Sequence, residues 1–476
     1  MLRHNLDVMH IEKNVFDNLV YTLLDDKKKS KDNLNARKDL RELNIRSDLW
    51  PDDNEKYQAA CFSLNNHGKD IFLSVLKNVK LPDGYASNLS SCVDVNSRKL
   101  SGLKSHDSHV IMRDLLSVAI RNLLPTDVSS AIVELCQFFR DISAKFLDID
   151  ELDKLQDRTV MTLCRLEMFF PPSFSQRWTL GYFKSYVRNR AKPEGSISEQ
   201  HLADEYITFC SMYLNDIETR FNRIGRVDDQ PPVEISIRTN SELPHIFPNH
   251  GRFVGAGQFH SLNHVERQQA HRHILGRMNR AIDIDREVHI NFSEWIRQKV
   301  QTNEIDGITD DLRCLAMGPS EKVLKYTAYN VNGFKFRATE REANLKTQNS
   351  GVYVAAETMS YASSRDSNPR TGTVNYYGNL IEVMEIDYYE VFKVVLFKCN
   401  WMDTRTERGY KQDAYGHHMV NFSRFLPTEE EGDEPYILAF QAKMVYYVKD
   451  PSEVEWNIAV HVQPRDVYDM GDSNDA

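Results

Sequence analysis

Two neighbouring stretches decide the fold of the second half of the chain: VNYYGNLIEVMEIDYY at residues 374–389 and VFKVVLFKCNWMD at residues 391–403. Both are rich in β-branched and aromatic residues, which suit the pleated, half-buried surface of a strand. Stretches of the same kind stand at residues 352–362, 436–450 and 456–464, with turn residues between them. Roughly five or six short strands over about a hundred residues predict a small antiparallel β-barrel.

The first 225 residues follow a helical pattern instead. In residues 5–25, apolar side chains recur at helical spacing, among them Val8, Val15 and Leu19. Further helices are predicted at 32–44, 67–79, 107–123, 127–146 and 149–167, and another begins at residue 198. We therefore expect an α+β chain with a mainly helical N-terminal half and a β-barrel near the C-terminus.

The stretch between the two halves has the composition of a linker. Residues 227–260, VDDQPPVEISIRTNSELPHIFPNHGRFVGAGQFH, are rich in Pro, Gly and turn residues. Helical pieces are predicted after it, at about 263–282 and at 291–301.

The net charge of −10 is concentrated at the C-terminal end. Residues 371–476 hold 19 Asp and Glu against 9 Lys and Arg, and subtraction from the totals of 69 and 59 leaves 50 of each sign before them. An acidic surface repels phosphate backbones, so the last region is poorly suited to contact DNA directly. It suits a basic protein partner better.

The remaining bulk features point to a protein inside a cell. The seven cysteines form no CxxC pair, which favours reduced thiols over a zinc ribbon. No window of eighteen uncharged apolar residues is present, so no membrane span is expected. The first residues lack an apolar signal-peptide core, so secretion is not expected either.

Several runs resemble proteins encoded by plant CACTA (En/Spm-type) DNA transposons. LRHNLDVMHIEKNVFDNLVYTLL, residues 2–24, resembles the end of their transposase domain. Three further runs resemble the helical domain of uncharacterised function that follows the transposase domain: GLKSHDSHVIM, LCRLEMFFPPSF and YVRNRAKPEGSI. Four runs near the end of the chain resemble the small C-terminal domain of the same polyproteins: NSGVYVAAETMSYASS, VNYYGNLIEVMEIDYY, VVLFKCNWMD and DEPYILAFQAKMVYYVKDP.

The resemblance implies a domain order. It places a remnant of the transposase domain at 1–60, a helical domain of unknown function at 61–225, a linker with short helices at 226–322, a β-rich domain at 323–470 and a disordered tail at 471–476. The barrel of the β-rich domain is expected to be SH3-like or BAH-like. A nuclear location is also implied.

The chemistry implied by the resemblance is that of a DDE-type transposase. Such enzymes are expected to cut and rejoin DNA at an RNase H-like site. There, two metals about 4 Å apart stabilise the attacking and leaving oxygens of a phosphodiester. Carboxylates are the ligands that magnesium prefers. Magnesium is therefore the expected cofactor if a catalytic site is intact, and no cofactor is expected otherwise.

The chain departs from the family pattern in two places. Met1 stands directly before LRHNLDVMHIEKN, so the upstream part with the first catalytic aspartates is missing from this sequence. The link at residues 175–185 is only SQRWTLGYFKS, where the family pattern has a longer segment with a Glu-Arg pair. We therefore expect a truncated chain that is not competent for catalysis.

Polar residues on the first helix offer one remnant of a catalytic site. Asp7, His10 and Asn14 lie at positions i, i+3 and i+7 and so share one face. This face either formed one wall of the catalytic cleft or is the solvent side of an amphipathic helix. Glu12 and Lys13 beside it support the solvent side.

A second candidate is the run His106-Asp107-His109 at the start of an apolar helix. Histidines three apart ligate one metal when a third ligand joins them. Alternatively, Ser105 or Asp107 serves as an N-cap, accepting hydrogen bonds from unpaired N–H groups. The helix dipole further favours a carboxylate there. We favour the cap.

Two basic or potentially ligating groups remain in the sequence. Lys184, Arg188, Arg190 and Lys192 cluster around Tyr186, and such a cluster either holds a nucleic-acid backbone or is merely solvated. We predict DNA contact through this part of the helical region.

The histidines at 260, 264, 271 and 273 have irregular spacing, so we interpret them as surface residues rather than as a zinc or copper site.

The aromatic residues of the predicted barrel suggest a protein-binding site. One interpretation is a cage for methyl-lysine, formed through cation–π attraction by aromatic residues that include Tyr376, Tyr377, Tyr388, Tyr389, Trp401, Tyr446 and Trp456. The alternative is that most of these rings are barrel core and cross-strand pairs.

Three functions follow from these observations. The first is a transposon-derived protein without catalysis that binds DNA through its helical region, or a basic protein or histone tail through its acidic barrel. The second is an active transposase subunit that performs metal-dependent phosphodiester cleavage and strand transfer. The third is the product of a decayed or mis-spliced gene without selected function.

Overall fold

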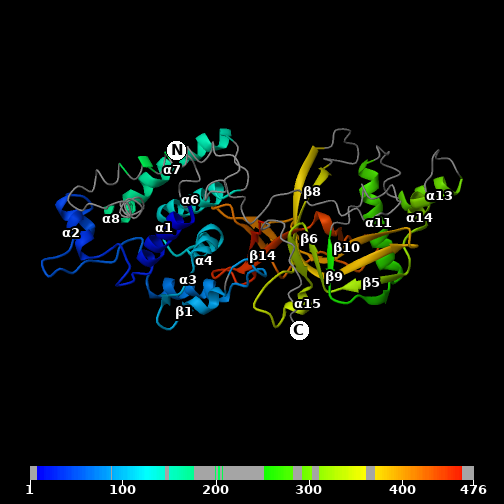
Figure 1. Ribbon diagram of the computed structural model, residues 1–476, viewed down its shortest axis with the longest axis horizontal. Coiled ribbons are helices and arrows are strands. Elements are labelled where there is room, and N and C mark those ends of the chain that lie inside the picture. Colours follow the sequence, from blue (N-terminus) through cyan, green and yellow to red (C-terminus); the bar gives the residue numbers. More distant parts are fainter. Residues whose placement is uncertain are drawn as a thin grey trace. The chain divides into compact units, whose positions relative to one another are not determined.

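A computed structural model describes residues 8–86, 88–144, 149–175, 251–281, 292–302, 310–360 and 370–463, together with residues 199, 202, 203 and 206. The chain divides into two compact units (Figure 1). Residues 1–79 and 86–226 form the helical unit, and residues 80–85 and 227–476 form the C-terminal unit. Helices and antiparallel sheets are both present, which confirms the predicted mixture of the two.

The helical unit contains most of the helices predicted from the sequence. They are α1 Val8–Leu23, α2 Leu34–Glu42, α3 Asn66–Asn78, α4 Ser105–Val110, α5 Leu116–Ala119, α6 Thr126–Ile142, α7 Ile149–Phe169 and α8 Pro172–Ser175, with a short hairpin of β1 Val93–Asp94 and β2 Lys99–Leu100. A π-helical turn at Ile111–Leu115 joins α4 to α5, so the helix predicted at 107–123 runs without a break from Ser105 to Ala119 and is locally widened.

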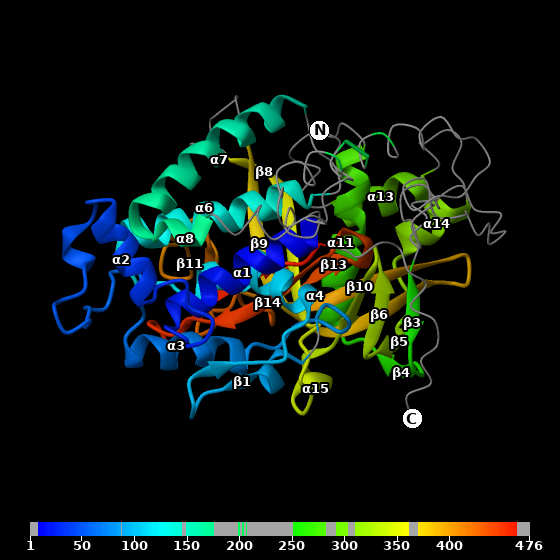
Figure 2. The same ribbon diagram turned by 60° about the vertical axis from the view of Figure 1, so that its left-hand side comes forward.

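The apolar stripe of α1 is buried within this unit. Val15, Leu19 and Leu23 are at most 1% exposed. Helices α6 and α7 run side by side over the unit (Figure 2). Beyond the end of α7, Phe170 stacks on Phe62 with ring centroids 4.6 Å apart. The helical periods seen in the sequence therefore mark the faces that pack together.

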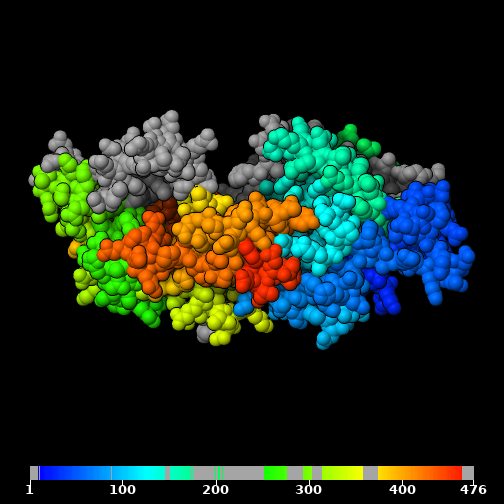
Figure 3. Space-filling model, turned by 180° about the vertical axis from the view of Figure 1, so that it is seen from behind, coloured from blue at the N-terminus to red at the C-terminus, as the bar shows by residue number. Residues whose placement is uncertain are grey.

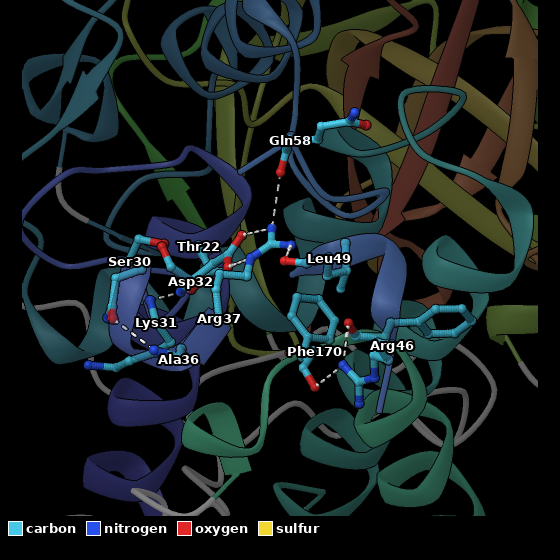
Figure 4. A network of polar contacts seen from close by, with 12 residues as sticks. Thr22, Ser30, Lys31, Asp32, Ala36, Arg37, Arg46, Leu49, Gln58 and Phe170 are labelled. Atoms are coloured by element: carbon cyan, nitrogen blue, oxygen red, sulfur yellow. Dashed lines mark hydrogen bonds and ion pairs between the residues drawn. The ribbon is translucent and has the colours of Figure 1, made fainter. Parts of the chain in front are cut away.

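Arg37 of α2 is fully buried, and its donors are satisfied by a local network (Figure 4). It donates to both carboxylate oxygens of Asp32, at 2.5 and 2.7 Å, and to the carbonyl oxygens of Leu49 at 3.0 Å and Gln58 at 3.3 Å. A buried guanidinium is tolerated only when charge and donors are both matched. This network therefore ties α2 to the loops around it.

The C-terminal unit is built on strands and a few helices. The helices are α11 His264–Ala281, α13 Phe292–Gln301, α14 Asp310–Met317 and α15 Thr339–Glu342. The strands after residue 321 are β5 Lys322–Tyr326, β6 Ala328–Val331, β7 Phe334–Arg337, β8 Gly351–Ser360, β9 Arg370–Tyr388, β10 Phe392–Trp401, β11 Tyr410–Gln412, β12 His418–Asn421, β13 Tyr436–Leu438, β14 Lys443–Lys449 and β15 Trp456–His461.

All of these strands pair antiparallel. The main sheet has the order β11-β12-β15-β14-β8-β9-β10-β13, with β5 beside β9. Among the strands that the structure describes, this path has two free ends, so the predicted closed barrel is not confirmed. Parts of the segment from β9 to β15, orange to red, are visible at the surface in the view from behind (Figure 3). No helix in the described ranges is long and apolar enough to cross a membrane.

The two stretches that decide the fold form the hairpin β9–β10, as their composition predicts. Its turn places Tyr389 and Glu390 at φ 55° and 62°, the left-handed pair of a tight hairpin turn. The glycine of the first stretch, Gly378, pairs with Trp401, and an added Cβ would come within 2.6 Å of that ring. Glycine is needed there because the indole approaches the backbone.

The predicted linker at 226–322 contains regular structure that its composition hides. Strand β3, Arg252–Val254, pairs with β6, and β4, Gln258–Ser261, pairs with β5. Phe253 stacks on Tyr326 with ring centroids 3.9 Å apart. The linker prediction is therefore wrong for residues 252–261, because their pairing partners lie far along the chain.

Residues 80–85 belong to the C-terminal unit although the residues on both sides belong to the helical unit. Asp83 forms ion pairs with Arg337 and, at 3.5 Å, with Lys335, both on β7. The backbone N–H of Gln348 donates to the carbonyl oxygen of Leu81 at 3.1 Å. This short segment completes the C-terminal unit through interactions that the sequence did not indicate.

Candidate functional site

Asp107 caps helix α4 from inside its first turn. The N-cap residue is Lys104, and the Asp107 carboxylate accepts a hydrogen bond from the Lys104 backbone N–H at 2.9 Å. Neither Ser105 nor Asp107 is itself the N-cap residue, because both already lie within the helix. The predicted N-cap position is therefore wrong, and Asp107 instead accepts its hydrogen bond from the third helical position, as in a capping box.

His109 pairs with a carboxylate from another helix. Its Nδ1 atom lies 2.6 Å from Oε2 of Glu12 on α1. Glu12 is fully buried, and its Oε1 atom has no hydrogen-bond partner among the described residues. The His109 side chain is 14% exposed. A buried carboxylate that fixes one ring nitrogen of a histidine is the arrangement that orients imidazoles in catalytic and metal sites.

Two further buried charges, Arg113 and Asp114, lie on the π-helical turn that follows α4. Arg113 donates to both oxygens of Asp114, at 3.0 and 2.9 Å, within the π-helical turn. Arg140 on α6 donates to the carbonyl oxygen of Arg113 at 2.6 Å. Burial raises the pKa of the nearby Cys136 thiol to about 12, so this thiol stays protonated. A π-helical turn beside buried ionisable groups is frequent at functional positions.

The predicted catalytic remnants are not assembled into a metal site in the described residues. Asp7 and the side chain of His10 lie outside them, and Asn14 is half-buried on α1. The His106 and His109 rings lie 6.1 Å apart. Within the described part of the chain, no group of three or more His, Cys, Asp or Glu side chains is placed to hold a metal ion.

Two interpretations of the sequence need correction. Glu12 does not mark a solvent side of α1, because it is fully buried against His109. Among the four histidines interpreted as surface residues, His271 is only 4% exposed and shares a hydrogen bond with the Tyr388 hydroxyl at 3.1 Å. The predicted DNA-contacting residues Lys184, Arg188, Arg190 and Lys192 lie outside the described residues.

The rings chosen from the sequence for a methyl-lysine cage are mostly core residues. Tyr388 and Tyr446 are 0% exposed and Trp401 is 4% exposed, so these three rings cannot receive a ligand at the surface. Tyr376 is half-buried and packs edge-to-face on Trp401, with centroids 6.4 Å apart. The cage prediction is therefore wrong for these three residues, and the alternative of core packing holds.

The sheet gathers a different set of rings. The ring cluster consists of Tyr353 of β8, Tyr377 of β9, Tyr410 of β11, His418 of β12 and His461 of β15. Neighbouring rings have centroids between 4.5 and 6.0 Å apart. The cluster forms because Tyr353 and Tyr377 are direct cross-strand partners and the other three strands follow in the same sheet.

The ring cluster runs from the core to the surface. Tyr377 is fully buried within a hydrophobic core with Met402 and Val420, whereas Tyr353, Tyr410 and His418 are half-buried and His461 is exposed. The Tyr410 hydroxyl and His418 Nδ1 are hydrogen-bonded at 2.7 Å, and the Tyr353 hydroxyl donates to Asn375 at 2.9 Å. The Tyr377 hydroxyl lies 3.3 Å from His461 Nε2.

Local electrostatics favour the neutral form of His418 and place an anion near it. Burial, reinforced by His417, lowers the pKa of His418. Burial alone would raise the pKa of Asp413, but hydrogen bonds from His417 and from the backbone hold it at about 2, so this carboxylate stays ionised. The sequence shows the aromatic residues and histidines of each strand, but it does not show that five strands bring these rings together.

The fold and these sites define a two-unit α+β protein with a buried carboxylate–imidazole pair in one unit and a ring cluster in the other. Residues 384–459 match the family model "Domain of unknown function (DUF4216)", and residues 142–179 and 176–228 match "Domain of unknown function (DUF4218)". Both domains are typical of plant transposon-derived proteins. No curated protein and no solved structure matches the chain.

Proposed function

We propose that this chain is a transposon-derived protein of the CACTA type that acts in the nucleus by binding. Its acidic C-terminal unit holds a basic protein partner, such as a histone tail. Catalysis is not its role in this proposal. The two matches to domains typical of transposon-derived proteins support the origin. The observation that carries the binding role is an acidic loop at residues 428–434.

The acidic loop presents carboxylates from a fixed backbone. Gln269 of α11 donates to the carbonyl oxygens of Thr428 and Glu430, at 3.1 and 2.7 Å, and Arg272 donates to that of Asp433 at 2.7 Å. Glu429, Glu430, Glu431 and Glu434 are exposed. A pre-ordered acidic surface attracts a basic segment and requires little ordering of its own on binding.

The test is binding of a fluorescent lysine-rich peptide to the full chain, measured by anisotropy at two salt concentrations. We expect affinity that falls as salt rises, because exposed charges are screened. Replacing Glu429, Glu430 and Glu434 by glutamine should weaken binding about tenfold or more, since several close charge contacts are lost.

The matched control replaces three exposed carboxylates elsewhere in the same unit, Glu340, Glu390 and Glu407, by glutamine. It changes the net charge by the same amount and should weaken binding much less. A peptide that does not bind at low salt contradicts the proposed function, and equal losses in both triple variants contradict its placement at the acidic loop.

The matches to transposon-type domains also favour a second candidate, an active DDE-type transposase subunit. In that case carboxylates of this chain or of another chain hold magnesium, and Lys184, Arg188, Arg190 and Lys192 contact the DNA. Hard cations of this kind require several oxygen ligands. A magnesium titration with DNA that carries terminal repeats distinguishes the two, because nicking is expected only for the transposase.

A further inference from the structure

We propose that the ring cluster of Tyr353, Tyr377, Tyr410, His418 and His461 binds a methylated or quaternary ammonium group. The inference rests on the proposed function and names the chemical group that the C-terminal unit selects within a basic partner. It differs from the cage predicted from the sequence, because four of its five rings were not among those candidates and it excludes Tyr376, Tyr388, Trp401 and Tyr446.

The first argument is the arrangement of the rings. Tyr353 and His461 meet edge-to-face at 4.5 Å, and Tyr410 lies stacked on Tyr377 at 6.0 Å. Tyr377 is fully buried, and the half-buried rings of the cluster pack against it. The negative face of an aromatic ring attracts a cation, and the half-buried rings of Tyr353, Tyr410 and His418 with the exposed His461 are those that a ligand can reach.

The second argument is that the hydroxyl groups of the cluster are already engaged. Tyr410 bonds with His418, Tyr377 with His461, and Tyr353 with Asn375. These bonds engage part of the polar atoms of the cluster, so ring faces make up most of the surface that a ligand meets. An unmodified ammonium needs acceptors for its three N–H donors, whereas a methylated ammonium needs fewer or none. The cluster thus suits the methylated form better.

The third argument is charge. The lowered pKa of His418 favours its uncharged form, and the ionised Asp413 acts on it electrostatically. Lys411, next to Tyr410, does not occupy the cluster, because alternate residues of a strand face opposite sides. Its Nζ atom lies 4.2 Å from the Trp456 ring and 2.6 Å from Glu453 instead. A cation from a partner is the occupant that these charges favour.

Stacking of nucleic-acid bases is the other use of exposed rings. The surrounding charge disfavours it, because residues 371–476 carry 19 acidic and 9 basic residues and would repel a phosphate backbone. A short single-stranded oligonucleotide that binds more tightly than the methylated peptide would overturn the proposal.

The test compares two lysine-rich peptides of one sequence, one with unmodified lysines and one with a trimethylated lysine, on the full chain by anisotropy. We expect the trimethylated peptide to bind about tenfold more tightly, a gain between those of an exposed and of a desolvated cation–π contact. Tetramethylammonium should compete with it and should shift the ring resonances of His418 and His461 in NMR spectra.

Variants at Tyr410 separate the ring face from the hydroxyl. Tyr410→Leu should abolish the preference for the trimethylated peptide, whereas Tyr410→Phe should keep it, since only the hydrogen bond to His418 is lost. His461→Leu, at an exposed position, should also remove the preference. The matched control is Tyr326→Leu, which removes a half-buried ring elsewhere in the unit, stacked on Phe253.

The outcomes separate this inference from the proposed function. Equal binding of the two peptides, or a preference that survives Tyr410→Leu, overturns the ring cluster as a methylammonium site but leaves the basic-partner proposal standing. No binding of either peptide overturns both. A preference that Tyr410→Leu and His461→Leu remove and Tyr326→Leu retains supports the inference.

Discussion

At the scale of single residues, the buried titratable groups carry the clearest consequences. Glu12 lies four residues after Val8 and three before Val15, so it occupies the apolar stripe of α1. That spacing could have revealed its burial. Its partner His109, 97 residues further along the chain, could not be found from periodicity, because helix packing brings the two together.

The Glu12–His109 pair predicts strong coupling between its members. His109→Ala leaves a buried carboxylate without its partner and should lower the free energy of unfolding by about 3 kcal/mol. The double variant Glu12→Leu, His109→Ala should cost less than the sum of the two single variants, because the uncompensated carboxylate is gone. Urea denaturation of the four proteins gives this cycle, and strictly additive losses would contradict it.

His271 predicts a pH-dependent stability. Burial, reinforced by Arg297 and Arg267, lowers the pKa of His271 from 6.5 to about 4. Between these values the unfolded chain binds a proton that the folded chain does not, so stability rises with pH over this window. Its contribution is complete above pH 6.5 and is lost as pH falls towards 4, by about 3 kcal/mol in all.

The measurement compares the wild type with His271→Gln by denaturation at several pH values between 4 and 7. Carboxylates that titrate in this range contribute equally to both proteins and cancel in the difference. The variant should show a flatter dependence on pH. Parallel curves for the two proteins would mean that His271 accepts its proton freely in the folded chain.

At the scale of secondary-structure elements, the sequence predicts those elements that depend on neighbouring residues and misses those that depend on distant ones. The ends of α1, α3, α6 and α7 lie within four residues of the predicted ends, because helical periodicity is written in consecutive residues. Strands β3 and β4 were missed, since short polar stretches become strands only when a distant partner such as β5 or β6 pairs with them.

The capping of α4 predicts a modest, local effect. Asp107→Ala removes the acceptor for the Lys104 N–H and a favourable charge near the helix N-terminus, and should cost about 1 kcal/mol. Asp107→Asn keeps an acceptor and should cost less. Thermal unfolding measures both, and an unchanged melting temperature for Asp107→Ala together with the loss of a bound metal would favour the metal interpretation instead.

At the scale of the whole molecule, the division into two units does not follow the order of the sequence. Residues 80–85 lie inside the stretch predicted as one helical domain, yet they pack within the C-terminal unit. Neither composition nor periodicity distinguishes this segment, because its membership is defined by ion pairs and backbone bonds to β7 and to the residues before β8. The ring cluster was unpredictable for the same reason.

This arrangement predicts that a substitution early in the chain weakens the C-terminal unit. Burial by itself raises the pKa of Asp83, but Thr347, Arg337 and Lys335 outweigh it, and the net pKa is lowered. Asp83→Ala leaves the largely buried Arg337 without its carboxylate and should destabilise this unit by about 2 kcal/mol. Amide hydrogen exchange should then accelerate in β7 and β14 and remain unchanged in α6.

The matched control is Asp70→Ala, which removes a more exposed ion pair with Arg98 in the helical unit and should have little effect. Faster exchange in α6 with Asp83→Ala, and none in β7, would show that residues 80–85 stabilise the helical unit instead.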